Sequence, residues 1–436
     1  MALHRFVVGS SLAFVFSAAI SPAQERPIAF VGAKVIPITA PPITDGTVVV
    51  RGGKIAAVGP SASVEVPADA ERIDVRGKVI MPGLIDTHSH VGGGWGADGS
   101  APIQPDVRVL DSINVRDAGF QKCRAGGLTT LNIMPGSGHL LSGQTVYVKL
   151  RKANVIEEFF IRDDRGVPMG GMKMANGTNS QREPPFPGTR SKSAALIRQK
   201  FVKALDYRKK IQDAGGDSTK LPERDLEMEG ILEVLDGKRV VHHHTHRADD
   251  IMTVLRLQKE FGFKVVLHHV SEGWRVADEI AKAGVPCSVI VVDSPGGKIE
   301  AMNMRYDTGA ILDKAGVLVA FHTDDWITDS RLFLRSAALA VRGGMPEDRA
   351  LYALTMAGAK MIELDKRIGS LEVGKDADLI VLSGEPLSVY TKVLQTYVEG
   401  QKVFDRSDPK DYLFAVGGYG ASRDQVVHAC CGEEDR

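Results

Sequence analysis

Short apolar runs of β-strand character occupy both flanks of the chain. They cover residues 29–35, 46–51, 54–58, 72–75 and 78–80 near the start, and residues 370–372, 377–382 and 393–398 near the end. Glycine and proline turns separate these runs, as is typical of consecutive short strands. The pattern therefore predicts two β-rich flanks around a long centre.

The centre of the chain alternates strand-like runs with amphipathic helical stretches. The strand-like runs cover residues 129–133, 145–150, 240–244, 264–269, 286–292 and 317–322, and the helical stretches include 193–214, 247–261 and 277–283. Such an alternation is typical of an α/β fold, and its length favours a parallel (β/α)8 barrel. A doubly wound open sheet is the competing architecture.

The first residues of the chain have the pattern of an export signal. His4 and Arg5 precede an apolar stretch over residues 6–20, and Ser21-Pro22-Ala23 offers a small-residue cleavage site. We expect removal of residues 1–23 and a periplasmic or secreted protein; an uncleaved N-terminal anchor is the alternative. No later apolar run reaches the roughly 18 residues that cross a bilayer, so no membrane partner is expected after signal removal.

The amino-acid composition limits the kinds of molecule that the protein is expected to bind. The 436 residues contain 54 Lys plus Arg and 54 Asp plus Glu, so no basic surplus favours nucleic acid. The 4 cysteines are too few for a disulfide scaffold, and the role of the adjacent Cys430 and Cys431 is left open. We expect a small-molecule or short peptide substrate as the partner, and we leave a homo-oligomer open.

Histidines stand where barrel strands are expected to end, which is where barrel enzymes carry their chemistry. The run that begins at Leu84 leads to His88 and His90. Residues two apart in an extended chain point the same way, so these two imidazoles could bind one ion together.

A second histidine tract ends the strand-like run 240–244. It contains His242, His243, His244 and His246. Alternation along a strand places His243 on the opposite side from the other three. We favour His244 as the ligand because it lies nearest the expected strand end.

Two later strand ends add further candidate ligands. His268 and His269 face opposite ways in an extended chain, so at most one of them points into a site. The run 317–322 is followed by Asp324 and Asp325. Histidine with carboxylate favours a divalent ion, above all Zn²⁺, which lowers the pKa of bound water while a carboxylate moves the proton. Such a site needs no serine or cysteine nucleophile.

Two segments resemble the signatures of the amidohydrolase superfamily. They are VIMPGLIDTHSH at residues 79–90 and GSLEVGKDADLIVL at residues 369–382. The resemblance extends over about residues 28–405, and it is strongest to the imidazolonepropionase-like and Xaa-Pro-dipeptidase-like branch. It implies a metal-binding barrel that carries a small β-sandwich built from both flanks. The implied division is 1–23 signal, 24–80 and 367–405 sandwich, 81–366 barrel, and 406–436 a tail of unknown role.

The resemblance also implies roles for individual residues. By position it makes His88, His90, His244 and His269 metal ligands, and it makes Asp324 both a metal ligand and the catalytic proton carrier. Many members have a carboxylated lysine that bridges two metals. Lys173 in GMKMA most resembles that lysine, and Lys149 in YVKL is its rival.

These observations together predict a metal-dependent amidohydrolase with one or two divalent ions, cleaving a C–N bond of an amide, peptide or cyclic amide. A mononuclear deaminase or imidazolone-type hydrolase is the first alternative, and a catalytically inactive metal-binding protein is the second. Arg247 could hold a substrate carboxylate in a bidentate fork. A salt bridge from Arg247 to Asp249 or Asp250 is the other interpretation.

Overall fold

The computed structural model describes residues 26–93, 98–291, 298–325, 327–417 and 421. The predicted signal segment, Cys430 and Cys431 lie outside the described residues. Within the described ranges, every helix is too short or too polar to cross a bilayer.

Strands from both ends of the chain form one eight-stranded sheet, with the order β17-β16-β15-β5-β1-β2-β3 and β4 paired to β1. Its strands are β1 (Ile28–Val35), β2 (Ile43–Arg51), β3 (Lys54–Pro60), β4 (Glu71–Asp74), β5 (Val79–Pro82), β15 (Leu379–Leu382), β16 (Val393–Val398) and β17 (Gln401–Asp405). The predicted flank strands at 29–35, 46–51, 54–58 and 393–398 fall within this sheet, and the run 377–382 does so from Leu379 onward. The predicted strand at 370–372 is wrong, because these residues form no strand.

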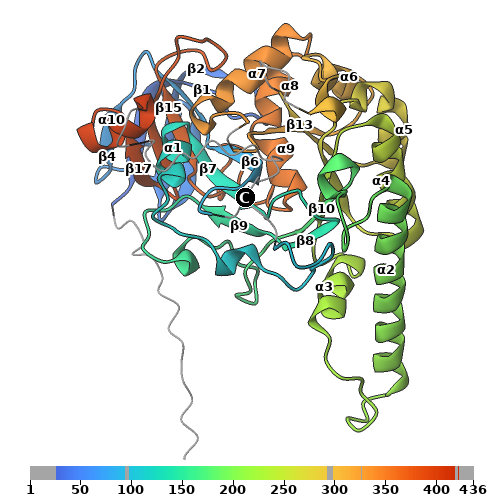
Figure 1. The fold of residues 1–436 in the computed structure, drawn as a ribbon. Coiled ribbons are helices and arrows are strands. Elements are labelled where there is room, and N and C mark those ends of the chain that lie inside the picture. Colours follow the sequence, from blue (N-terminus) through green and yellow to red (C-terminus); the bar gives the residue numbers. More distant parts are fainter. Residues whose placement is uncertain (1–25, 94–97, 292–297, 326, 418–420, 422–436) are drawn as a thin grey trace, which may run out of the picture.

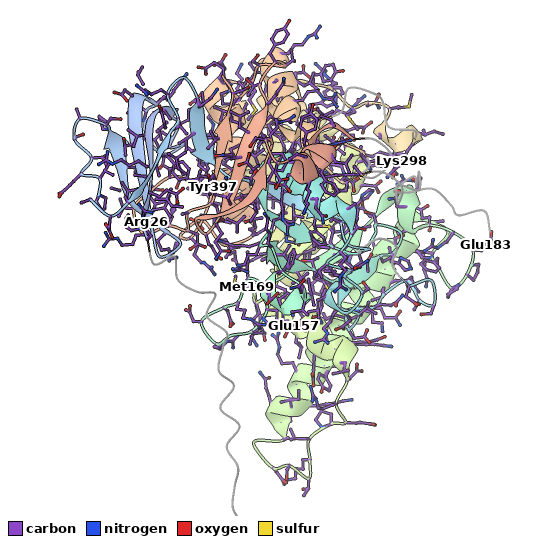
Figure 2. All side chains as sticks on the ribbon, turned by 90° about the vertical axis from the view of Figure 1, so that its left-hand side faces the viewer. Arg26, Glu157, Met169, Glu183, Lys298 and Tyr397 are labelled. Atoms are coloured by element: carbon purple, nitrogen blue, oxygen red, sulfur yellow. The ribbon has the colours of Figure 1, made fainter. Side chains whose placement is uncertain are left out.

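The two flanks meet where β5 pairs antiparallel with β15, in a register that places Ile80 opposite Val381. A separate apolar core lies against this sheet, and within it the rings of Phe30 and Tyr397 meet edge to face with centroids 4.9 Å apart. Figure 1 shows the sheet at one side of the molecule, and Figure 2, in which that side faces the viewer, shows Tyr397 to the left of Lys298.

The centre of the chain forms a six-stranded sheet, order β14-β13-β12-β11-β10-β8, and a three-stranded sheet, order β6-β7-β9. The strands are β6 (Leu84–Ser89), β7 (Leu128–Ile133), β8 (Leu141–Gln144), β9 (Val146–Lys149), β10 (Met172–Ala175), β11 (Val241–Thr245), β12 (Val265–His269), β13 (Cys287–Ile290) and β14 (Val319–His322).

Strands β10 to β14 are parallel and lie side by side in chain order. A doubly wound sheet reverses its strand order at a switch point, and this sheet does not. At its far edge β14 lies next to β6, where the Asp324 N–H donates to the His88 carbonyl at 3.0 Å. The carboxyl ends of β6 and β14 are thereby brought together.

The predicted parallel run at residues 145–150 is antiparallel instead. It forms β9, which pairs antiparallel with β7, while the preceding β8 pairs antiparallel with β10. Parallel neighbours need a crossover of a dozen or more residues, and only residues 134–140 separate β7 from β8. The stretch 141–149 therefore passes from one central sheet to the other, and the expectation of parallel strands throughout is wrong here.

Helices follow most of the parallel strands. They are α1 (Ala118–Ala125), α2 (Arg190–Asp213), α3 (Leu226–Leu235), α4 (Ala248–Phe261), α5 (Ala277–Ala283), α6 (Thr308–Lys314), α7 (Phe333–Arg342), α8 (Glu347–Ala353), α9 (Met356–Met361) and α10 (Pro409–Val416). Short 3-10 helices are η1 (Val109–Asp111), η2 (Ile156–Glu158), η3 (Gly177–Ser180), η4 (Gly273–Arg275), η5 (Ile299–Ala301) and η6 (Ser330–Leu332).

The predicted helices at 193–214, 247–261 and 277–283 correspond to α2, α4 and α5, within three residues at each end. Local chemistry sets these boundaries. Thr189 caps α2 by accepting from the Lys192 N–H at 3.2 Å, and Gly262 ends α4 in the left-handed conformation that a side chain disfavours. The tail from residue 406, for which the sequence predicts no element, contains α10.

Every residue of β6, β7, β11 and β12 is buried, as in a sheet that is covered on both faces. Strand β11 reads VHHHT, so three imidazoles lie in this interior. A buried polar group is costly unless it has a partner, so histidines at such positions indicate a site rather than ordinary packing.

A buried ion cluster joins the centre to the eight-stranded sheet. Lys149, at the end of β9, is fully buried and pairs with Asp376, with Asp378 at 3.0 Å and with Glu399 at 3.3 Å. Burial raises the pKa of Glu399, but the hydrogen bond from Arg151 and the charge of Lys149 outweigh it and lower that pKa to about 2. The charge of Lys149 also overcomes burial to lower the pKa of Asp376, whereas burial raises the pKa of Asp378. The cluster therefore holds ionised Asp376 and Glu399 against a buried ammonium.

Replacing Lys149 by methionine is expected to destabilise the fold by about 3–5 kcal/mol, because it removes the buried ammonium that Asp376, Asp378 and Glu399 share. Urea unfolding followed by circular dichroism measures this change. The exposed pair between Lys209 and Asp213 supplies the control, since Lys209→Ala should leave the unfolding midpoint unchanged. Equal midpoints for the two variants would show that Lys149 does not stabilise the fold through charge.

Candidate metal centre

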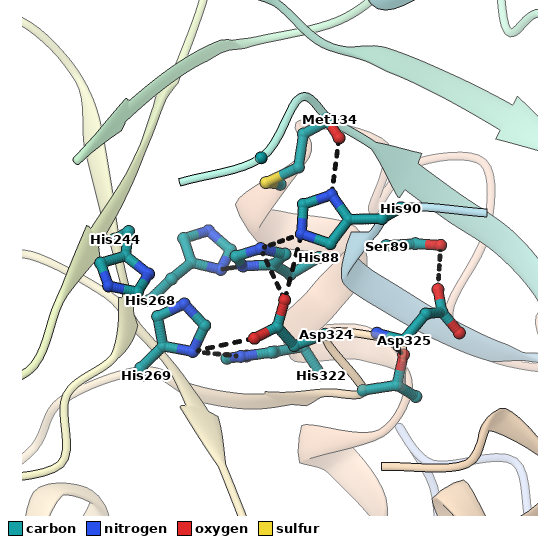
Figure 3. A network of polar contacts seen from close by, with 12 residues as sticks. His88, Ser89, His90, Met134, His244, His268, His269, His322, Asp324 and Asp325 are labelled. Carbon is teal, nitrogen blue, oxygen red and sulfur yellow. Dashed lines mark hydrogen bonds and ion pairs between the residues drawn. The ribbon is translucent and has the colours of Figure 1, made fainter. Parts of the chain in front are cut away.

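Four polar side chains converge where β6, β10 and β14 meet. His88 Nε2 lies 3.3 Å from His90 Nε2, 3.1 Å from Lys173 Nζ and 3.2 Å from Asp324 Oδ1. The same Asp324 oxygen lies 3.1 Å from His90 Nε2. Figure 3 shows the two rings and the carboxylate facing one another. The structure thus brings together residues that are up to 236 positions apart in the sequence (88 to 324).

The backbone around this cluster is fixed by a buried carboxylate. Asp86 accepts from the His88 N–H at 3.0 Å and from the Thr323 N–H at 3.2 Å, so it joins the ends of β6 and β14. Asp324 follows with φ 54°, a left-handed conformation that is uncommon for residues other than glycine. This turn presents the Asp324 carboxylate to the histidines instead of continuing the strand.

A hydrogen bond at Nδ1 fixes the orientation of the His90 ring. Its Nδ1 lies 2.8 Å from the Met134 carbonyl oxygen, an acceptor only, so Nδ1 carries the proton and donates. A neutral imidazole has one N–H, so Nε2 presents a lone pair to the cluster. This is the arrangement in which a histidine binds a metal ion.

His244 and His269 form the other side of the centre. Their ring centroids are 4.3 Å apart, and both rings are buried. His244 Nδ1 and His269 Nε2 have no hydrogen-bond partner among the described residues. Buried ring nitrogens without partners are unusual, because each costs desolvation free energy.

His246 and Lys298 lie beside His244. Lys298 Nζ is 3.4 Å from His244 Nε2, 3.3 Å from His246 Nε2 and 2.9 Å from Asn179 Oδ1. The sequence prediction did not include Lys298 or Asn179, because neither belongs to a motif. Only the contact in three dimensions connects them to the histidine tract.

Two more histidines lie behind the predicted ligands. His268 Nδ1 is 3.2 Å from His88 Nδ1, and His322 Nε2 is 3.1 Å from His269 Nδ1. The sequence prediction assigned neither a role. The available signal was their position: each stands within two residues of a predicted ligand, His269 or Asp324.

Burial controls the charge of these groups. Burial lowers the pKa of His242 to about 3, helped by the charge of Lys173, and burial also lowers the pKa of His322 to about 3. Burial alone raises the pKa of Asp324, but the hydrogen bond with His90 and the electrostatic interactions with His90, His322 and Lys173 bring it below its usual value. Near neutral pH the imidazoles of His242 and His322 are therefore neutral, beside an ionised Asp324.

The two lysines named from the sequence lie in different places. Lys173, on β10 opposite His242, is fully buried and reaches His88. Lys149 reaches the carboxylates of the ion cluster that joins the centre to the eight-stranded sheet. Lys173 is thus the lysine that adjoins the histidines.

Arg247 forms the salt bridge that the sequence analysis gave as its other interpretation. Its Nε and Nη2 donate to the two oxygens of Asp249 at 3.0 and 2.9 Å, at the start of α4. Both side chains are about half exposed. The structure thus shows the salt bridge to Asp249, and substrate binding by Arg247 stays a prediction.

Among the residues that the structure describes, three groups of side chains have ligand atoms close enough to hold a metal ion. They are His88 with His269 and Asp324, His244 with His246 and His269, and His88 with His268 and His322. All of these residues are buried. Nitrogen ligands with one carboxylate are the donor set that zinc and related divalent ions prefer.

Comparisons with known proteins agree with this chemistry. The model of the amidohydrolase family matches residues 224–404. The crystal structure of an amidohydrolase from Thermotoga maritima MSB8 superposes with a TM-score of 0.81 at 36% identity, over 87% of this chain and 100% of that one.

Two curated relatives extend over most of the chain. Amidohydrolase tasK of Hapsidospora irregularis is 27% identical over 398 residues, which are 83% of this chain but only 40% of that protein. Imidazolonepropionase of Symbiobacterium thermophilum is 23% identical over 382 residues, which are 78% of this chain and 84% of that protein.

Proposed function

This chain belongs to the amidohydrolase superfamily, and we propose that it cleaves an amide, a peptide or a cyclic amide at the cluster of His88, His90, Lys173 and Asp324. Members of this superfamily are metal-dependent and hydrolyse carbon–nitrogen bonds. The observation that carries the proposal is the convergence of these four side chains within 3.1–3.3 Å of His88 Nε2 or of one another.

The residues present suit a divalent ion. His244 Nδ1 and His269 Nε2 are buried and without a partner among the described residues, which a metal bond would correct. His90 presents its Nε2 lone pair, and Asp324 is ionised. We assign His88, His90, His244, His269 and Asp324 as the residues that would hold the metal, zinc above all.

A divalent ion held by these residues would lower the pKa of a water molecule toward neutrality and would polarise the scissile carbonyl. The protein supplies the proton transfer. Asp324 Oδ1 contacts His90 and His88, while Asp324 Oδ2 lies 3.8 Å from His269 Nδ1. We assign Oδ2 as the atom that takes a proton from the attacking water and gives it to the leaving nitrogen.

Lys173 is proposed to be carboxylated. Its amine lies in a fully buried site, where an ammonium is costly, and a neutral amine can add CO₂ to form a carbamate with loss of one proton. A carbamate would supply oxygen ligands to a second ion. The centre would then hold two metals.

Lys173→Ala is expected to reduce the zinc content from two ions per chain to one or none. Elemental analysis of protein produced with added bicarbonate measures this. Lys209→Ala, a change at an exposed lysine, is the control and should keep two ions. One ion in both the native protein and Lys173→Ala would instead favour the second candidate function, a mononuclear deaminase or imidazolone-type hydrolase, to which the similarity with imidazolonepropionase points.

The proposed function is tested by incubating the zinc-loaded protein with linear amides, dipeptides, N-acyl amino acids, lactams and imidazolones, and by following release of the amine or opening of the ring. Turnover of at least one class, lost after chelation, is the expected result. A protein that holds zinc and turns over none of them would fit the inactive metal-binding protein instead.

Architecture and location belong to the same proposal. We propose that the central sheets close as a (β/α)8-type barrel over residues 81–366, with β8 and β9 as its antiparallel member, and that residues 24–80 and 367–405 form a small β-sandwich beside it. The contact between β14 and β6 supports this closure. We also propose that residues 1–23 direct export to the periplasm or the medium.

A further inference from the structure

A chain of buried side chains extends from His88 away from the proposed metal centre. His88 Nδ1 lies 3.2 Å from His268 Nδ1, His268 Nε2 lies 3.0 Å from His242 Nδ1, and His242 Nε2 lies 3.1 Å from the Tyr147 hydroxyl. All four side chains are at most 3% exposed. The chain therefore links a proposed ligand on β6 to a hydroxyl on β9 through β12 and β11.

Each contact in this chain needs one proton, and each neutral imidazole carries one. This leaves two consistent arrangements. In the outward arrangement, His88 donates from Nδ1, and His268 and His242 both donate from Nε2. In the inward arrangement Tyr147 donates, His242 and His268 both carry the proton on Nδ1, and the His88 proton is on Nε2.

Only the outward arrangement is compatible with a metal at the centre. His88 Nε2 faces Lys173, His90 and Asp324, so it is the nitrogen that would bind the ion. A nitrogen that carries a proton cannot bind a metal. Metal binding at His88 and the direction of the whole chain are therefore coupled.

We propose that His268 is a positioning residue for the metal centre: it accepts the Nδ1 proton of His88, and metal binding fixes the outward arrangement of the chain from His88 through His268 and His242 to Tyr147. This inference rests on the proposed metal centre and deepens it. In this role His268 would bind neither the metal nor the substrate, although its ring lies close enough to His88 and His322 to join a metal-binding group. It would act by fixing the tautomer and the ring orientation of His88.

The same arrangement recurs behind a second proposed ligand. His269 Nδ1 lies 3.1 Å from His322 Nε2, His322 Nδ1 lies 2.7 Å from Ser288 Oγ, and Ser288 Oγ lies 2.6 Å from Thr87 Oγ1. His269 Nε2 is left buried and without a partner among the described residues. A back-to-back histidine thus supports a proposed ligand on two different strands.

Nitrogen NMR of histidine-labelled protein tests the direction of the chain in the native sequence. The ¹⁵N shifts of each ring show which nitrogen carries the proton, and single substitutions assign the signals. With zinc bound, His268 and His242 should both carry the proton on Nε2. A proton on Nδ1 of either ring in the zinc-loaded protein would overturn the proposal.

Two substitutions of His268 separate positioning from packing. Asparagine places an acceptor oxygen where Nδ1 stands, whereas leucine fills similar space without one. We expect His268→Leu to weaken zinc binding about 10–100-fold in a chelator competition, and His268→Asn to restore most of this loss. His139→Leu replaces another buried histidine, one whose hydrogen-bonded neighbour is Arg182, and should leave zinc affinity unchanged.

Equal zinc affinities for His268→Leu and the native protein would contradict the positioning role. Failure of this inference is distinct from failure of the proposed function. If the protein binds zinc and hydrolyses an amide while His268 carries its proton on Nδ1, only the proposed direction of the hydrogen bonds from His88 to Tyr147 is wrong. If the tautomers are as expected but no substrate is turned over, only the proposed hydrolase function is contradicted. If the protein binds no zinc, both the proposed function and this inference are contradicted.

Discussion

Asp324→Asn is expected to lower kcat by about 10²–10⁴-fold, the range over which a positioned proton carrier contributes to catalysis. Asparagine keeps the shape of the side chain and tolerates the left-handed φ of 54° at this position better than most residues. It cannot accept a proton from water at neutral pH. The loss should therefore fall on kcat, and the fold should be retained.

Steady-state kinetics on any amide substrate found by the panel measures this effect, with zinc content determined in the same sample. Asp329→Asn is the matched control, since Asp329 lies on the same segment but caps η6 and pairs with Arg331. Its kcat should equal that of the native protein. Full activity in zinc-loaded Asp324→Asn would remove Asp324 from the proton transfer.

His88→Ala should abolish tight zinc binding and lower kcat/KM by about 10³-fold or more. His88 Nε2 lies within 3.1–3.3 Å of His90 Nε2, Lys173 Nζ and Asp324 Oδ1, so its loss removes a central member of the proposed ligand set. Loss of metal stabilisation costs several kcal/mol in the transition state, and about 4 kcal/mol corresponds to this factor. His139→Ala, at another buried histidine, is the control for loss of an imidazole. Native zinc content and activity in His88→Ala would place the metal elsewhere.

Much of the fold could be predicted from the sequence because local patterns determine it. The run of apolar residues from Leu84 to the histidines predicts a buried strand, and β6 has every residue buried. The membership in the amidohydrolase superfamily, inferred from residues 79–90 and 369–382, is confirmed by the family and structural matches.

The antiparallel β8 and β9 could not be predicted in this way. A short apolar run such as residues 145–150 has the same pattern whichever way its neighbours run. Its direction depends on the length of the connection before it and on pairing partners that are distant in sequence, β7 and β10.

The sequence could predict which residues belong to the site, but not which of them lie in contact. Alternation identified His88 and His90 as a pair, but it cannot show that His268 lies behind His88 or that Lys298 reaches His244. Those contacts join separate strands and loops. In the same way, the bidentate geometry that suits Arg247 for a substrate carboxylate also suits Asp249, and the structure shows that pairing.

The most direct test of the central claim is a zinc titration of activity. Protein freed of metal by a chelator is supplied with increasing zinc, and hydrolysis of an amide substrate is followed at each step. We predict that activity is absent without zinc and rises to saturation at one or two equivalents per chain. Hydrolysis by the metal-free protein that zinc does not increase would contradict a metal-dependent amidohydrolase.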